Sequence, residues 1–351
     1  MKPSSPGILL DLTCMVFLPI GFVLVLRSLD FILIPFLIAL LFCYVIGLPM
    51  DYLHRHRVPA PIRILLTVVL LLAIMYGLEE IIQQNMASLL DSWPEFEKKF
   101  WGYAMVFLDR LDISETEARE TIRAFFANLG RKDFKPIGVM VQYLSGSVFA
   151  FLGSAIWVIL FVVFILAERG ALARKIVKGF GPDRAINILN TMQTINVSVQ
   201  QYLGLKTLIC LATGILVGVA LALLQVPFAF LWGLLAFLLN YIPNIGSVVA
   251  GLPPVLITLF ESGSLLKTLV VTAVFVFIQF LVGNVVEPRI LGKGLNLSPL
   301  VVLLSLLFWG WLWGIPGMLL SVPLTAAFKI AMDQFEVSRP MAILLGDNPR
   351  F

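Results

Sequence analysis

The stretch NYIPNIGSVVAGLPP, residues Asn240–Pro254, breaks a long apolar tract, and WGIPGMLLSVPL, residues Trp313–Leu324, breaks another near the end of the chain. Each break combines Pro and Gly within a tract that is otherwise long enough to cross a lipid bilayer. Irregular backbone at membrane depth persists only where protein or a water-filled cavity satisfies its polar groups. Two discontinuous helices of this kind are typical of the substrate site of a secondary transporter. The two breaks therefore predict a transport pathway.

Composition places the chain in a membrane. Of its 351 residues, 60% are hydrophobic and 13% are charged, and the mean hydropathy of +0.98 is too high for a soluble protein. Apolar runs long enough for a helical span, each with at most one charged residue, occupy residues 8–26, 31–48, 62–78, 147–167, 207–226 and 268–286, and the broken tracts occupy residues 228–260 and 299–328. The predicted fold is an all-α integral membrane protein with about eight membrane segments, including two broken, re-entrant helical hairpins, and a small helical extramembrane insert.

Basic residues predict the orientation, because cytoplasmic loops are rich in Lys and Arg. The loop His54–Arg63 and the basic segment Arg169–Lys206 are expected to face the cytoplasm, and Glu79–Lys135 is expected to form a helical domain on the outer side. We divide the chain into the first three spans (1–78), a periplasmic helical domain (79–146), a fourth span with a cytoplasmic amphipathic helix (147–204), a transport core (205–336) and a cytoplasmic tail (337–351).

The transport core contains an internal repeat. The sequence LKTL at residues 205–208 recurs at residues 266–269, and the same alignment brings Pro227 opposite Pro288 without a gap. Each copy continues through an apolar tract to its own Ile-Pro and Gly break. If each copy is one span followed by a hairpin, the two copies cross the membrane in opposite directions and form an inverted repeat. The alternative is that the match is accidental and that each long tract is a single kinked span.

Polar residues and glycines around the breaks form the candidate site. Asn240 and Asn244 flank the first break with amide groups, and glycines allow a ligand to approach the backbone closely. The candidate substrate or ion pathway comprises Asn240, Pro243, Asn244, Gly246, Ser247, Asn284, Glu287, Arg289, Gly314, Pro316, Gly317 and Ser321.

Glu287 is the leading candidate for an ion-binding group. It directly follows the last full span, and a charged residue within a membrane costs roughly 2.5–3.5 kcal/mol on insertion scales. Its carboxylate can bind a proton or a cation, or hydrogen-bond to a polyol. The alternative is an interfacial ion pair between Glu287 and Arg289 that only fixes the end of the span.

Three stretches resemble the signature region of a known family. FLWGLLAFLLNYIPNIGSVVAGLPPVL, GNVVEPRILGKGLNLSPLVVLLSLLFWGW and GMLLSVPLTAAFKI are similar to the autoinducer-2 exporter (AI-2E) family, and within it to the quorum-signal exporter branch. The resemblance covers nearly the whole chain. The family's Pro-Asn-x-Gly motif corresponds to Pro243, Asn244 and Gly246, and its Glu-Pro-Arg motif to Glu287, Pro288 and Arg289. The resemblance implies a multi-pass protein of the bacterial inner membrane that assembles as a homopentamer.

The resemblance also implies an activity, namely export of autoinducer-2 or, as in other members, sodium–proton antiport. Autoinducer-2 is small, polar and rich in hydroxyl groups, so its site should offer several hydrogen-bond donors and acceptors. The expected partners are this substrate, the lipid bilayer and further copies of the chain, without nucleic acid and without a cofactor. The coupling ion is expected to be H⁺ or Na⁺.

The sequence lacks the motifs of several other classes of membrane protein. The ATP-binding signature G-x-x-x-x-G-K-[ST] is absent from the sequence, so active transport is expected to use a gradient. The sequence also lacks the H-E-x-x-H and G-x-S-x-G motifs of hydrolytic enzymes, so an enzyme is not expected. Cys14, Cys43 and Cys210 lie in apolar runs and are expected to be buried rather than bonded to a metal. An oligomeric channel or a membrane scaffold is the remaining alternative.

Overall fold

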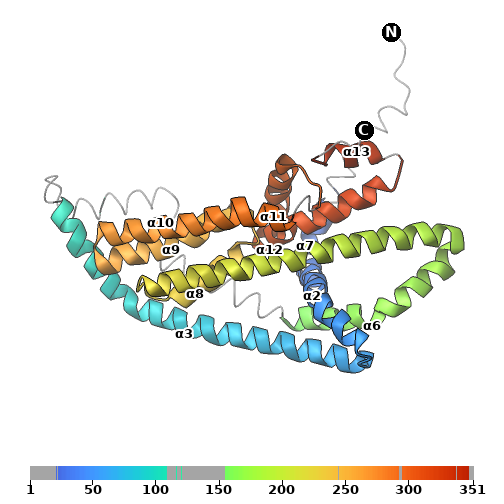
Figure 1. Ribbon diagram of the computed structural model, residues 1–351, viewed down its shortest axis with the longest axis horizontal. Coiled ribbons are helices and arrows are strands. Elements are labelled where there is room, and N and C mark those ends of the chain that lie inside the picture. Colours follow the sequence, from blue (N-terminus) through green and yellow to red (C-terminus); the bar gives the residue numbers. More distant parts are fainter. Residues whose placement is uncertain are drawn as a thin grey trace, which may run out of the picture. The chain divides into compact units, whose positions relative to one another are not determined.

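The computed structural model describes residues 21, 23–108, 116, 120, 155–243, 245–291, 295–336 and 338–347, and every regular element in these ranges is helical. The elements are α2 (Asp30–Arg55), α3 (Ala60–Leu108), α6 (Ala155–Phe180), α7 (Pro182–Leu223), α8 (Ala229–Leu239), α9 (Ile245–Ser262), α10 (Leu265–Leu281), the π-helix η2 (Val282–Val286), α11 (Glu287–Leu291), α12 (Pro299–Asp333) and α13 (Arg339–Leu344) (Figure 1). This confirms the predicted all-α class.

The chain divides into two compact units. The first comprises residues 1–68, 154–204 and 293–351, and therefore contains α2, α6, α12, α13 and the first half of α7. The second comprises residues 69–153 and 205–292, and contains most of α3, the second half of α7, and the elements α8 to α11. The two broken tracts belong to different units, so each is described by itself.

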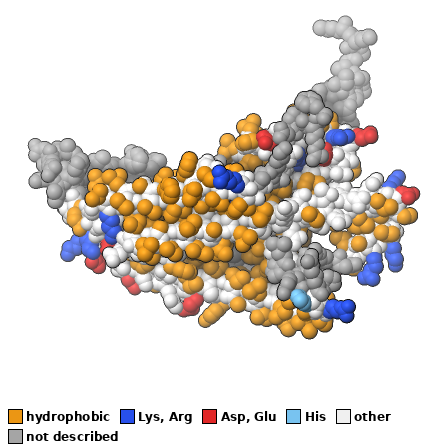
Figure 2. Space-filling view, viewed as in Figure 1, with side chains coloured by type: hydrophobic (Ala, Val, Ile, Leu, Met, Phe, Trp, Pro, Cys, Tyr) orange, Lys and Arg blue, Asp and Glu red, His pale blue; other side chains and the backbone are white. Residues whose placement is uncertain are grey.

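Helix length and surface chemistry identify a membrane protein. Six helical segments in the described part of the chain are long and apolar enough to span a bilayer, or seven if α6, which bends by 64°, counts as one span. Leu265, Leu266, Leu269, Phe277 and Phe280 of α10 are all more than half exposed. Figure 2 shows hydrophobic side chains over much of the face formed by α9 and α10. Such a surface is stable against lipid tails but not against water.

The helix α3 crosses the predicted boundary between the third span and the outer domain. It is 49 residues long, or roughly 74 Å at the rise of an α-helix, whereas the hydrocarbon core of a bilayer is about 30 Å thick. Part of α3 therefore extends beyond the membrane, and after Arg63 near its start the next charged residue of the helix is Glu79. The further helix predicted from Ser114 to Gly130 lies outside the described residues.

Aromatic and polar contacts hold α2 against its neighbours in the first unit. Phe36 of α2 meets Phe161 of α6 edge to face, with the ring centroids 5.5 Å apart. The Tyr44 hydroxyl of α2 donates a hydrogen bond of 2.6 Å to the side-chain oxygen of Asn196 on α7. Edge-to-face aromatic pairs and satisfied hydroxyls are the expected contacts where Phe and Tyr lie between helices.

The first broken tract folds as a pair of packed helices, α8 and α9, which we call the first hairpin. Trp232 and Ala236 of α8 share a buried cluster with Ala250 and Ile257 of α9. The chain reverses between Asn240 and Asn244, where Pro243 lacks the N–H that a continuing helix would need. The second limb continues antiparallel into α10, which lies beside it (Figure 1).

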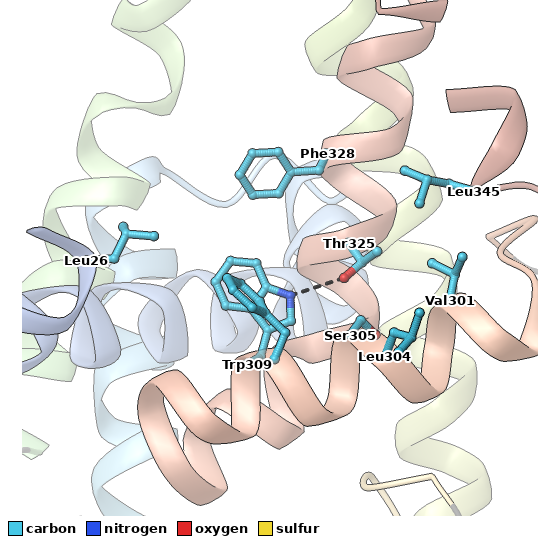
Figure 3. A pocket seen from close by; sticks show the side chains of 9 residues that line it. Leu26, Val301, Leu304, Ser305, Trp309, Thr325, Phe328 and Leu345 are labelled. Carbon is cyan, nitrogen blue, oxygen red and sulfur yellow. Dashed lines mark hydrogen bonds between the residues drawn. The ribbon is translucent and has the colours of Figure 1, made fainter. Parts of the chain in front are cut away.

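The second broken tract, the helix α12, also folds back on itself, and we call it the second hairpin. Gly314 has φ 64° and ψ −141°, values that interrupt the helix. The Trp309 indole N–H donates a hydrogen bond of 3.1 Å to the hydroxyl of Thr325, 16 residues later (Figure 3). In a straight helix these residues would be about 24 Å apart. The tract is therefore a hairpin and not a single kinked helix, as the broken sequence predicts.

Within each hairpin, a glycine after the turn lies very close to the backbone of the first limb. A Cβ on Gly246 would collide with the carbonyl of Leu239, and a Cβ on Gly317 would collide with the carbonyl of Trp309. In both hairpins this glycine follows an Ile-Pro pair. The two copies of the sequence repeat therefore form the same close contact between glycine and backbone. Re-entry of the hairpins into the bilayer, the inverted direction of the repeat and the count of eight segments stay predictions.

Candidate functional site

A buried ion pair joins two helices of the second unit. Nζ of Lys206, on α7, lies 2.5 Å from Oε1 of Glu287, the first residue of α11. The Lys206 side chain is 3% exposed and that of Glu287 is 24% exposed. Charges inside a membrane are costly and are found paired with one another or lining pathways. This pair is therefore the strongest indication of a functional site in the unit.

A π-helical turn sets the direction of the Glu287 side chain. The Glu287 N–H bonds to the carbonyl of Val282, five residues earlier, at the end of η2. Pro288 has no N–H, and its ring would clash with the carbonyl four residues before it in a regular helix. The extra residue in the turn relieves this clash and rotates every following side chain by about 100°. Single π-turns of this kind frequently occur at functional sites.

Asn240, at the turn of the first hairpin, is bound to the same face of α7. Its side-chain amide donates hydrogen bonds to the hydroxyl of Thr213 at 3.2 Å and to the sulfur of Cys210 at 3.6 Å. Lys206, Cys210 and Thr213 are spaced i, i+4 and i+7, so they share one face of α7. All three are buried. The turn of the first hairpin and the ion pair thus lie along a single polar stripe.

Tyr241 adds a second link between the turn and α7. Its hydroxyl donates a hydrogen bond of 2.8 Å to the hydroxyl of Thr207, which follows Lys206 in the chain. We call the whole set the α7 polar cluster: Lys206, Thr207, Cys210, Thr213, Asn240, Tyr241 and Glu287. Its members offer an ammonium, a carboxylate, an amide and several hydroxyls, which is the set of groups that a small polyhydroxylated solute can bind.

Glycines bring the first hairpin close enough to α7 to form this cluster. A Cβ on Gly233 of α8 would lie 2.8 Å from the carbonyl oxygen of Gly214 and 2.9 Å from Cα of Gly218. Gly214 and Gly218 form a G-x-x-x-G motif, which allows two helix backbones to approach closely in a membrane. The contact lies two turns before Asn240 on α8. It therefore fixes the position of the turn against α7.

The structure assigns different surroundings to the predicted residues of the first break. Asn240 lies in the α7 polar cluster, Gly246 is buried beside the carbonyl of Leu239, and Pro243 and Ser247 are half-buried in the turn. Asn244 lies outside the described residues.

The predicted residues near the π-helix separate into one that is bound and two that are exposed. Glu287 pairs with Lys206, whereas Arg289, its alternative partner in the sequence analysis, is exposed. Asn284 is also exposed, and its amide donates a hydrogen bond of 3.2 Å to the carbonyl of Phe280 on its own helix. Glu287 therefore does not pair with Arg289, as the alternative from the sequence proposed. It pairs with Lys206, on a helix that is far from it in the sequence.

The predicted residues of the second break lie in the first unit. Gly314 is the pivot of the second hairpin, Pro316 is half-buried, and Gly317 is buried where the two limbs meet. Ser321 is fully buried, and its hydroxyl donates a hydrogen bond of 2.7 Å to the carbonyl of Met318.

The sequence analysis missed most of the α7 polar cluster. It grouped Lys206 with the basic residues that set orientation, whereas the structure buries Lys206 within the second unit. Two signals were available. Lys206 directly precedes the uncharged run 207–226, and LKTL places it opposite Lys267 in the repeat. A lysine at the start of an apolar span is expected to have a partner, and Glu287 is the acidic residue that directly follows the last full span.

Three features together are typical of a polytopic membrane transporter. The chain has helices that are long and apolar enough to span a bilayer. It also has two hairpins broken at Pro and Gly, and an ion pair that lies beside one of the breaks. Residues 12–336 match the sequence profile described as AI-2E family transporter, and the chain belongs to that family. It is 35% identical over 319 residues to the AI-2 transport protein TqsA of Escherichia coli K12, a match that covers 90% of each chain.

Two further relatives extend the comparison. YhhT of Escherichia coli K12, provisionally designated a transport protein, is 33% identical over 315 residues, covering 90% of this chain and 88% of YhhT. A Haemophilus influenzae protein with the same provisional designation is 34% identical over 328 residues, covering 91% of each chain. The printed names of these two relatives state no substrate.

Proposed function

We propose that the protein is a secondary transporter of the bacterial inner membrane that exports autoinducer-2 or a similar small polar metabolite. The name of its relative TqsA supports this substrate, because that name states AI-2 transport and the similarity covers 90% of each chain. The α7 polar cluster supports a polar solute rather than a lipid, because it presents hydrogen-bonding groups inside an apolar unit.

The ion pair between Lys206 and Glu287 is the observation that supports coupling of transport to a gradient of H⁺ or Na⁺. Protonation of Glu287, or a cation bound to its carboxylate, neutralises the partner of a buried ammonium and weakens the bond between α7 and α11. The charge of Lys206 must then be compensated by another acceptor or by water. A proton or sodium ion arriving at Glu287 therefore shifts the balance between two arrangements of these helices, which is what coupling to a gradient requires.

The neighbouring hydroxyls and amide are the groups proposed to bind substrate. Asn240 holds Thr213 and Cys210 through its amide nitrogen, so its side-chain oxygen is the atom that we assign to a substrate hydroxyl. The candidates of the second hairpin, Gly314, Pro316, Gly317 and Ser321, keep a proposed role in the pathway because their break repeats the first one. We also propose homopentamers, as the family resemblance implies.

Uptake of labelled autoinducer-2 into proteoliposomes that contain only this protein tests the proposal. Saturable uptake that rises with an imposed proton or sodium gradient is expected. Glu287→Gln should remove the response to the gradient, measured below its lowered melting temperature because the variant leaves the Lys206 ammonium unpaired. Glu261→Gln is the matched control, because it makes the same change at a carboxylate of the second unit that pairs with Lys267 and lies outside the candidate pathway, and it should behave like the unchanged chain. Gradient-dependent uptake by Glu287→Gln would contradict the role of the carboxylate.

A sodium–proton antiporter is the second candidate function, and the same ion pair favours it. A carboxylate whose counter-ion is a lysine can exchange a proton for Na⁺ without any organic substrate. Sodium-dependent proton movement in the same vesicles, without uptake of autoinducer-2, would make this the primary function. If neither flux is observed, a membrane scaffold is the remaining function. A flux that does not change with an imposed gradient would indicate a channel.

A further inference from the structure

An apolar pocket lies between the two limbs of the second hairpin. It has a volume of about 360 Å³ and is lined by Leu26, Val301, Leu304, Ser305, Phe308, Trp309, Thr325, Phe328 and Leu345. Figure 3 shows Trp309 between the limbs, with Leu26 and Leu345 on opposite sides of it. The volume falls within the range of about 300–1,000 Å³ that is typical of ligand sites.

The polar groups in the lining are already hydrogen-bonded within the protein. The Ser305 hydroxyl donates to the carbonyl of Val302 at 2.8 Å. The Thr325 hydroxyl accepts the indole N–H of Trp309 at 3.1 Å. A polar solute entering this pocket would lose bonds to water with little replacement, whereas an alkyl chain would lose none. The lining therefore selects a hydrocarbon and is unsuited to the proposed substrate of the α7 polar cluster.

The pocket is continuous with the lipid-facing surface of α12. Leu304, Phe308 and Phe328 line the pocket and are also 54%, 41% and 50% exposed. Leu300, Leu303 and Leu307 extend the same apolar surface along the first limb. Apolar cavities do not retain water, and an empty one would lose dispersion contacts along its whole lining. In a bilayer, the medium available to fill it is lipid hydrocarbon.

A cationic side chain lies at one end of the pocket. Lys329 follows Phe328 in α12, and its ammonium lies beside Gly346, the residue after Leu345. It donates a hydrogen bond of 2.5 Å to the carbonyl of Asn296, which fixes its position. A fixed positive charge at the end of an apolar pocket can attract the anionic headgroup of a lipid.

From these observations we propose that the pocket of the second hairpin binds the acyl tail of a membrane phospholipid, with the headgroup at the Lys329 end and the tail directed past Trp309 toward Leu26. The bound tail fills the space between the two limbs. The lipid is then a structural ligand of the hairpin and is distinct from the transported solute.

Quenching of tryptophan fluorescence by brominated acyl chains tests this proposal. The full chain contains seven Trp residues, and six can be replaced by Phe so that only Trp309 or only Trp311 remains. Trp309 is 6% exposed and faces the pocket, whereas Trp311 is 61% exposed on the outer surface. In liposomes of phosphatidylglycerol with dibrominated tails, Trp309 should be quenched about as strongly as Trp311, despite its burial. Quenching of Trp311 alone would overturn the proposal.

Blocking variants separate entry of a tail into the pocket from general contact with lipid. Val301→Phe narrows the pocket at the end near Leu345 and should remove most of the quenching of Trp309. Leu303→Phe is the matched control, because Leu303 lies on the same limb, is exposed and does not line the pocket. Equal quenching in both variants would contradict a tail between the limbs, as would Trp309 emission typical of contact with water.

A second measurement uses the unchanged chain, so it does not depend on the folding of any variant. A phospholipid with a photoreactive diazirine in its acyl tail is reconstituted with the protein, activated by light, and the adducts are mapped by mass spectrometry. Adducts are expected on the pocket-lining residues of both limbs, namely Val301, Ser305 and Trp309 on the first and Thr325 and Phe328 on the second. Adducts restricted to outward residues such as Leu303, Leu307 and Trp311 would reject the site.

Discussion

The ammonium of Lys206 lies 2.5 Å from the carboxylate of Glu287, although 81 residues separate them in the chain. One end of the pair belongs to α7, which also binds the turn of the first hairpin through Thr213 and Thr207. The other end follows a π-turn and directly precedes Pro288. A change at Glu287 therefore reaches the hairpin turn through a single helix. This linkage is the physical basis of the proposed transport mechanism.

Removing one partner of the ion pair should destabilise the protein more than removing both. Lys206→Met leaves a carboxylate without its cation and should cost about 3 kcal/mol, at the lower end of the range for buried pairs because Glu287 is partly exposed. The double variant Lys206→Met, Glu287→Gln should recover most of this loss. Thermal unfolding in detergent, followed by size-exclusion chromatography, measures the difference.

The repeat supplies the control for this experiment. Lys267 occupies the equivalent position, but its ammonium lies 3.9 Å from Glu261, and both side chains are about one-third exposed. Lys267→Met should change stability by less than about 1 kcal/mol, as is usual for exposed pairs. An equal loss in both lysine variants would show that the burial of Lys206 has no special consequence.

Gly233→Ala should separate α8 from α7. The added methyl group would meet the backbone of Gly214 and Gly218 at less than 3.0 Å, and overpacking of this kind costs about 1–3 kcal/mol. Because the turn of the first hairpin moves with α8, uptake should fall together with the melting temperature. Gly77→Ala is the matched control, because Gly77 is helical and a Cβ there meets open space. Its melting temperature should be unchanged or slightly higher.

Gly314→Ala should destabilise the second hairpin through the backbone alone. Nothing lies within 4 Å of the position that a Cβ would occupy, but φ is 64° and ψ is −141°. A residue with a side chain is strained in this region by about 1–3 kcal/mol. Gly179→Ala adds the same methyl group in α6, where space is open and the backbone is helical, and should be tolerated. Equal melting temperatures for the two variants would refute the proposed pivot.

Asn240→Leu should separate folding from transport. The change removes the hydrogen bonds to Thr213 and Cys210, but the Thr213 hydroxyl also donates to the carbonyl of Ile209. The stability loss should therefore be limited to about 1 kcal/mol, while uptake of autoinducer-2 falls sharply. Asn284→Leu is the control, because that amide is exposed and bonds only within its own helix in the described structure. Equal uptake in both variants would remove Asn240 from the site.

Sequence patterns predicted the helical membrane class and both hairpins because these features depend on local chemistry. Pro243 lacks the N–H of a continuing helix, Gly314 allows a positive φ, and apolar runs of span length have few other uses. The AI-2E resemblance agreed with the matched sequence profile. The alternative of single kinked helices fails for α12, because Trp309 could not reach Thr325 along a straight helix.

The composition of the α7 polar cluster could not be predicted in the same way. Asn240 reaches Thr213 because three glycines let α8 pack closely on α7, and Glu287 reaches Lys206 from the end of a π-turn. The packing of α8 on α7 and the pairing of Lys206 with Glu287 depend on tertiary contacts, which a local sequence pattern does not specify. The sequence instead offered Arg289 as an alternative partner, since it is only two residues from Glu287.

Cys210 offers a native reporter for the central claim that substrate passes the α7 polar cluster. It is a free, buried cysteine beside Asn240. With Cys14 and Cys43 replaced by Ala, its reaction with a small organomercurial can be timed in proteoliposomes with and without autoinducer-2. The account predicts measurable reaction that autoinducer-2 slows in a saturable manner, at concentrations that also saturate uptake. Identical rates with and without autoinducer-2, in vesicles that transport it, would contradict the account.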